Sequence, residues 1–86
     1  MDRIRLEDFD YSVPAELFAL KRKKHGPVTY RRFETAAEAI RYAVEHLSRS
    51  LLDGTTIETG AERLDGRTIQ QLYGGDRYPL KRTATR

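Results

Sequence analysis

The clearest hydrophobic pattern in the chain predicts one long amphipathic helix over residues 35–51. Apolar residues recur there at intervals of three and four and so share one stripe of a helix: Ala36, Ala37, Ile40, Ala43, Val44, Leu47 and Leu51. Thr35 followed by Glu38 has the order of a capping box and marks the start. Asp53-Gly54 marks the end, because glycine readily adopts the left-handed conformation that often follows a helix.

A second, shorter helix is expected over residues 66–73. Asp65 is its predicted N-cap, Leu64 can pack against Ile69 across the first turn, and Gly74-Gly75 ends it. Between the two helices, residues 55–59 are rich in β-branched side chains and are predicted as a strand. Because this strand has a single large apolar residue, we expect one of its sides to face water.

The first third of the chain allows two interpretations. Residues 28–33 have the composition of a strand, and His25-Gly26-Pro27 before them is a turn signal. Residues 16–23 can form the partner strand of a hairpin or, with Ser12 as cap, a helix. We favour the hairpin because it pairs the later strand locally.

The predicted fold is therefore α+β, with elements in the order ββαβα. A small antiparallel sheet, made of the N-terminal hairpin and a third strand, packs on one long helix, and a short helix follows. With 86 residues the chain has room for one domain, expected over residues 13–80. The acidic head, residues 1–12, and the basic tail, residues 81–86, are expected to be flexible.

Composition narrows the class of protein. Hydrophobic residues make up 38% of the chain and charged residues 34%, so we expect a thin core. The absence of cysteine excludes disulfides and thiolate metal sites. No apolar run approaches the ~20 residues that span a bilayer, and acids interrupt the N-terminal stretch where a signal peptide is apolar. We expect a cytoplasmic monomer or homodimer without membrane contact.

Positive charge is concentrated in one segment. Residues 17–33 hold six cations and no acid, although the formal net charge of the chain is only +3. In the predicted hairpin they converge on one ribbon, whose candidate binding residues are Lys21, Arg22, Lys23, Lys24, Tyr30, Arg31 and Arg32. Such a ribbon favours phosphates, because neutralised charges release counterions, and an exposed ring can stack on unpaired bases. The alternative is a solvated hairpin whose charges protect a sheet edge.

The tyrosine-rich segment 72–80 is the second candidate surface. Its possible contact residues are Leu72, Tyr73, Tyr78, Pro79 and Leu80. Tyrosine gives a large contact area at low entropic cost, so this segment could bind a partner protein or a second copy of the chain. The alternative is that the same side chains fold back and close the thin core.

Nothing in the sequence indicates catalysis or metal binding. Ser48 and Ser50 lie near His46, but no third residue marks a catalytic triad. Gly74-Gly75-Asp76 lacks the preceding strand of a phosphate-binding loop. We predict a non-enzymatic binding module with no cofactor and no metal, whose partner is nucleic acid or an acidic protein. A protein-interaction or self-associating regulator is the alternative.

Two stretches carry a resemblance to other proteins. The sequences YRRFETAAEAIRYAVEHL and LYGGDRYPL resemble short bacterial proteins of uncharacterised function, which implies no activity. Residues 35–44 are also similar to the helix that follows a basic strand in ribbon–helix–helix regulators. That family places a full helix between the strand and this one, whereas here Phe33 almost adjoins the cap Thr35.

Overall fold

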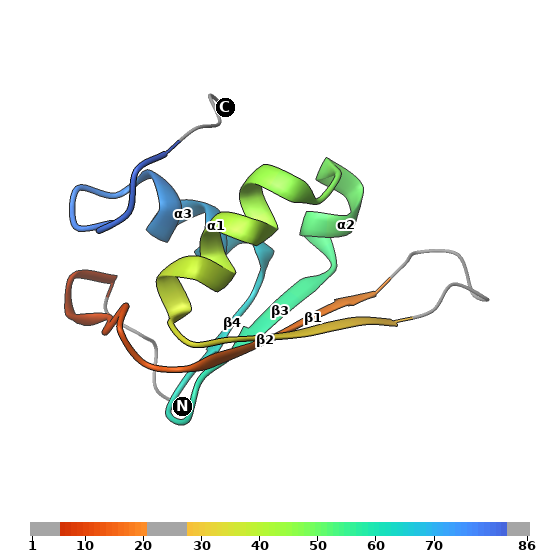
Figure 1. The fold of residues 1–86 in the computed structure, drawn as a ribbon. Helices are drawn as coiled ribbons and strands as arrows, with labels where there is room; N and C mark the ends of the chain where they lie inside the picture. The colour runs from red at the N-terminus through yellow and green to blue at the C-terminus, as the bar shows by residue number, and fades with distance from the viewer. Residues whose placement is uncertain (1–5, 21–27, 83–86) are drawn as a thin grey trace.

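Three helices lie on one face of a four-stranded antiparallel sheet (Figure 1). The structure is a computed structural model that describes residues 6–20 and 28–82, and all statements below concern these residues. The elements are η1 (Leu6–Asp8), β1 (Ala15–Leu20), β2 (Val28–Phe33), α1 (Ala36–His46), α2 (Arg49–Asp53), β3 (Thr55–Glu58), β4 (Arg63–Leu64) and α3 (Gly66–Gly74). The predicted α+β class is confirmed.

The N-terminal hairpin is present, and its first strand is central in the sheet. The strand order is β2-β1-β3-β4, so that β1 pairs with both β2 and β3. Strand β4 was not predicted. It has only two residues and pairs with β3 after a turn in which the Thr59 amide donates to the Glu62 carbonyl at 2.9 Å. Two residues are too few to show an alternating pattern in the sequence.

The single long helix predicted over residues 35–51 is wrong, because the helix is interrupted at Leu47 and Ser48. Leu47 has extended backbone angles, and the Ser48 hydroxyl accepts the Leu51 amide at 3.2 Å, which makes it the N-cap of a new helix. The observed order is thus ββααββα in place of ββαβα. Gly54, which follows α2, has φ −101°, so the expected left-handed conformation is also absent there.

The core lies between the sheet and the helices. Leu17, Ile57 and Leu64 project from the covered face of the sheet and are fully buried against apolar residues of α1, α2 and α3. Parts of the predicted head and tail also pack on this domain. Phe9 belongs to the core, and the Arg82 side chain donates hydrogen bonds to the carbonyls of Tyr73 and Gly75 at the end of α3.

Gly66 sets the spacing between α2 and α3. A Cβ atom at this position would lie 2.5 Å from the carbonyl oxygen of Leu52, which is closer than real Cβ contacts. The absence of a side chain therefore allows the start of α3 to lie directly against the end of α2.

Candidate functional site

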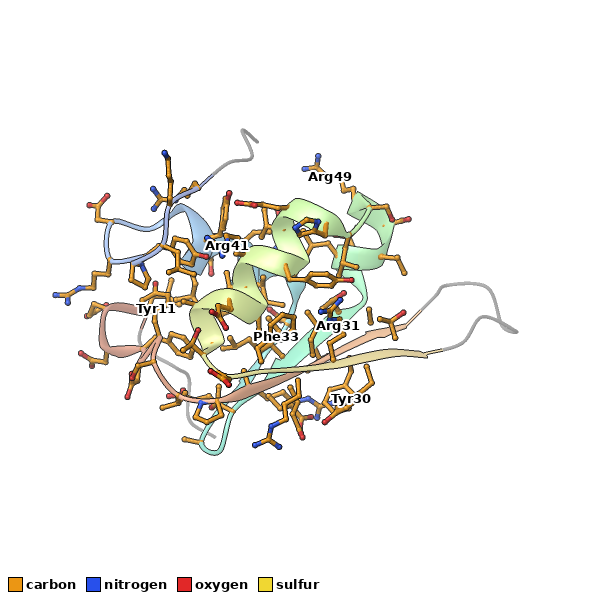
Figure 2. All side chains as sticks on the ribbon, viewed as in Figure 1. Tyr11, Tyr30, Arg31, Phe33, Arg41 and Arg49 are labelled. Carbon is orange, nitrogen blue, oxygen red and sulfur yellow. The ribbon has the colours of Figure 1, made fainter. Side chains whose placement is uncertain are left out.

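The open face of the sheet, on the side away from the helices, carries two aromatic rings in contact. On β1 the residues Ala15, Leu17 and Ala19 are buried, so the alternate residues Glu16 and Phe18 lie on the open face. Phe18 is paired with Tyr30 of β2, and their ring centroids are 5.2 Å apart. Tyr30 is 51% exposed and projects away from the helices (Figure 2).

Charged side chains flank this ring pair. The Tyr30 hydroxyl donates to Oε2 of Glu16 at 2.8 Å, and this hydrogen bond raises the pKa of Tyr30. Nη1 of Arg32 lies 3.9 Å from the same carboxylate oxygen. Glu58 and Arg63 form a second ion pair across β3 and β4, at 3.6 Å. The charges of these four flanking side chains therefore balance.

A shallow hollow of about 220 Å³ lies beside the charged pairs on the open face. Glu16, Arg32 and Glu58 contribute side chains to its lining, together with Pro14, Ala15, Thr59 and Gly60. The hollow therefore offers both a guanidinium donor and carboxylate acceptors next to the aromatic rings.

Arg31 does not belong to this face. Its guanidinium carbon lies 4.6 Å from the ring centroid of Tyr42 and 5.5 Å from that of Phe33, on the helix side of β2 (Figure 2). Tyr42 stacks in turn on His46, with ring centroids 5.2 Å apart. These rings hold the guanidinium by cation–π contacts.

The predicted basic ribbon is therefore divided. Successive side chains of a strand point to opposite faces, so Tyr30 and Arg32 lie on the open face and Arg31 lies on the other. The single surface expected for these three residues is not formed. The run Lys21, Arg22, Lys23 and Lys24 lies outside the described residues.

Strand β2 also forms one edge of the sheet. Within residues 6–20 and 28–82 it pairs only with β1, and no backbone hydrogen bond joins it to a turn or loop. In an antiparallel pair, alternate residues direct their amides and carbonyls away from the partner strand. Half of the six residues of β2 therefore direct backbone groups towards the outer edge of the sheet.

The tyrosine-rich segment 72–80 does not form the second predicted surface. Leu72, Tyr73 and Tyr78 are buried, whereas Leu80 is half-buried and Pro79 is exposed. The Tyr78 hydroxyl donates to the Ala37 carbonyl at 2.9 Å, and the Tyr73 hydroxyl donates to Oε2 of Glu45 at 2.6 Å. These side chains close the core, as the alternative interpretation of the segment stated.

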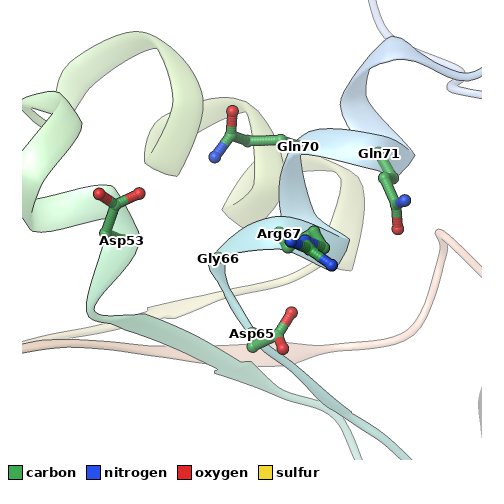
Figure 3. A pocket seen from close by; sticks show the side chains of 6 residues that line it. All are labelled: Asp53, Asp65, Gly66, Arg67, Gln70 and Gln71. Carbon is green, nitrogen blue, oxygen red and sulfur yellow. The ribbon is translucent and has the colours of Figure 1, made fainter.

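An open hollow of about 630 Å³ lies between the end of α2 and the start of α3 (Figure 3). Its lining is polar and consists of Asp53, Asp65, Gly66, Arg67, Gln70 and Gln71. Asp65 caps α3 by accepting the Thr68 amide at 2.9 Å, which lowers its pKa. Among these lining residues there is no serine, threonine or cysteine.

Comparisons with other proteins give no family for this chain: no family model, curated protein or solved structure matches it. In the described part of the chain, no group of three or more histidine, aspartate or glutamate side chains could hold a metal ion. None of the described helices is both long and apolar enough to cross a membrane. The geometry of the sheet is therefore the basis for inferring a function.

The sequence prediction of this site missed Phe18 and the flanking residues Glu16, Glu58 and Arg63. Phe18 lies in the segment AELFAL, where apolar residues at consecutive positions hide the alternation of a strand. The turn signal in the sequence, His25-Gly26-Pro27, does not give the observed register, in which Phe18 pairs with Tyr30.

Proposed function

We propose that the protein is a small non-enzymatic binding module that holds single-stranded nucleic acid on the open face of its sheet. The observation that carries this proposal is the contact between Phe18 and the half-exposed ring of Tyr30. Every base has a flat π face, and stacking on an aromatic side chain contributes about 1–3 kcal/mol per base. Bases in a duplex are already stacked on one another, so this surface favours unpaired bases.

The charged side chains beside the rings add contacts for the rest of a nucleotide. Arg32 is exposed, and its distant pairing with Glu16 is of the kind that contributes less than ~1 kcal/mol, so a phosphate can replace that carboxylate. The carboxylates of Glu16 and Glu58, which line the neighbouring hollow, can accept hydrogen bonds from base amino groups. Acidic side chains beside a phosphate oppose binding, so the affinity depends mainly on the rings.

The run Lys21–Lys24 is part of the proposal on sequence grounds. It belongs to the connection between β1 and β2 and contains four consecutive cations. Charges of this density attract a polyanion over a Debye length of about 10 Å at ordinary salt. We expect the cations to increase the rate of association and the rings to select single strands.

The test measures binding of a labelled oligothymidylate of about ten nucleotides by fluorescence anisotropy. Phe18→Ala should weaken the affinity by roughly fivefold to a hundredfold, because it removes one stacking surface. Tyr42→Ala is the matched control, since it removes a ring from the other side of β2. Both variants are first checked for folding by circular dichroism.

Two results would overturn the proposal. One is an equal loss of affinity in Phe18→Ala and Tyr42→Ala, which would show that the open face is not the binding surface. The other is equal or tighter binding of a duplex of the same length, which would remove stacking as the source of affinity.

A further inference from the structure

We propose that the outer edge of β2 binds an extended peptide with two consecutive acidic residues between apolar ones, as an additional strand of the sheet. The peptide would lie beside β2 in the plane of the sheet, so it uses the backbone edge of β2 and shares with the open face only the side chains of Tyr30 and Arg32. Strand addition of this kind takes its affinity from main-chain hydrogen bonds and its specificity from alternate side chains.

The edge of β2 is accessible and has the length that strand addition needs. Tyr30, Arg31 and Arg32 are exposed, and Thr29 and Phe33 are half-buried. The six residues of the strand contain no proline, so the described backbone has no gap in its hydrogen-bonding groups. The opposite edge, β4, has only two residues and offers no comparable ladder.

The order of side chains along β2 predicts the sequence of the peptide that would bind beside it. A strand paired with Tyr30-Arg31-Arg32-Phe33 places one side chain directly opposite each of these residues, with Cβ atoms about 4.5–5.5 Å apart. Acidic residues are favoured opposite the two arginines, and apolar residues opposite the two rings. The order apolar–acidic–acidic–apolar reads the same in both directions, so it fits a parallel or an antiparallel strand.

The side chain of Arg31 is already oriented to form an ion pair with a carboxylate of the peptide. Its guanidinium is held against Tyr42 and Phe33, and no carboxylate of the described residues forms an ion pair with it. A side chain that is already oriented loses less conformational entropy on pairing. Arg32 has only the distant contact with Glu16, so it can also turn towards a second acidic residue.

A second copy of the chain fits this edge less well than a separate acidic peptide. Pairing β2 with another β2 would bring four arginines into one short ladder, and like charges at neighbouring positions are destabilising. The chain has its own segment of the required order, Leu6-Glu7-Asp8-Phe9. That segment includes the helix η1, and Phe9 is buried in the core, so it is not available as an extended strand.

The experiment uses a fluorescein-labelled peptide of sequence TVEEVT and the full chain, with binding followed by anisotropy. Two control peptides have the same charge: the rearranged sequence TEVVET, and TVEEVT with alternate backbone amides methylated. Both should bind about tenfold more weakly, because the first misplaces the acids and the second loses main-chain hydrogen bonds.

Protein variants separate this edge from general charge attraction. Arg31→Glu should weaken binding of TVEEVT by about tenfold or more. Arg67→Glu, the same change at an exposed residue of α3, should leave it unaltered. Hydrogen exchange on the unaltered protein gives an independent readout, in which the peptide should slow exchange of amides within residues 29–33.

Several outcomes would overturn the inference. These are equal binding of TVEEVT and TEVVET, equal losses in Arg31→Glu and Arg67→Glu, slowed exchange only outside residues 29–33, or no binding. A rise in mass with protein concentration, measured by light scattering without peptide and enhanced by Arg31→Glu because that change relieves the repulsion between arginines, would assign the edge to a second copy instead. Phe18→Ala should leave peptide binding intact, which distinguishes this surface from the proposed nucleic-acid surface.

Discussion

Leu17 and Phe18 are neighbours on β1, but they lie on opposite faces of the sheet and in very different surroundings. Leu17 is fully buried under the helices, whereas Phe18 contacts one exposed ring and remains partly open to solvent. The large apolar side chains of the covered face therefore form the core and stabilise the fold. Those of the open face form part of the proposed binding surface. The cross-strand contact between Phe18 and Tyr30 stabilises the sheet, and it also leaves an aromatic surface on the open face.

The largest expected effect on stability distinguishes Leu17 from Phe18. Leu17→Ala should lower the free energy of unfolding by about 2–5 kcal/mol, because it leaves a cavity between sheet and helices. Phe18→Ala should cost less, about 1–2 kcal/mol, since its ring is partly exposed to solvent and the substitution leaves no enclosed cavity. Urea unfolding of both variants measures the difference. Equal losses would contradict the assignment of the two faces.

A smaller effect is expected where α2 and α3 meet above the covered face. Gly66→Ala should destabilise the protein by about 1–3 kcal/mol, because the new Cβ atom meets the Leu52 carbonyl at 2.5 Å and the backbone must shift. Gly74→Ala is the matched control, since a Cβ atom there has no heavy atom within 4 Å. Its effect should be neutral or stabilising by up to about 1 kcal/mol. Thermal unfolding of the pair tests the close contact, which a stabilised Gly66→Ala protein would exclude.

The sequence predicted best those features that depend on residues close along the chain. The hydroxyl of Thr35 accepts the Glu38 amide, and the carboxylate of Asp65 accepts the Thr68 amide, as the capping patterns indicated. Each of these contacts spans three residues. Local chemistry therefore sufficed to place the starts of α1 and α3.

Other features depend on competition between alternative local structures, or on contacts between residues far apart in the chain. The helical stripe continues through Leu47 to Leu51, and only the capping of a new helix by Ser48 decides against a single helix. Burial of Tyr78 depends on its hydrogen bond to Ala37, which is 41 residues away in the chain. By contrast, the separation of Arg31 from Arg32 follows from strand alternation alone, so the sequence already contained the information that divides the predicted ribbon.

The smallest expected effect on stability concerns two tyrosines, one under the helices and one on the open face. Burial raises the pKa of Tyr78 well above its ordinary value, and the hydrogen bond to Glu16 raises that of the exposed Tyr30. The unfolded chain releases a tyrosine proton near pH 10, before the folded chain does. The free energy of unfolding should therefore change little between about pH 8 and 9 and fall as the pH rises through 10 and above. Tyr78→Phe should cost about 1 kcal/mol at neutral pH through the lost hydrogen bond to Ala37, and should reduce the alkaline decline in the free energy of unfolding.

Tyr30→Phe is the control and should change this alkaline decline less, because water solvates its exposed hydroxyl in both states. Urea unfolding between pH 8 and about 11 measures both slopes. A larger change in Tyr30→Phe than in Tyr78→Phe would reverse the distinction between the buried and the exposed ring.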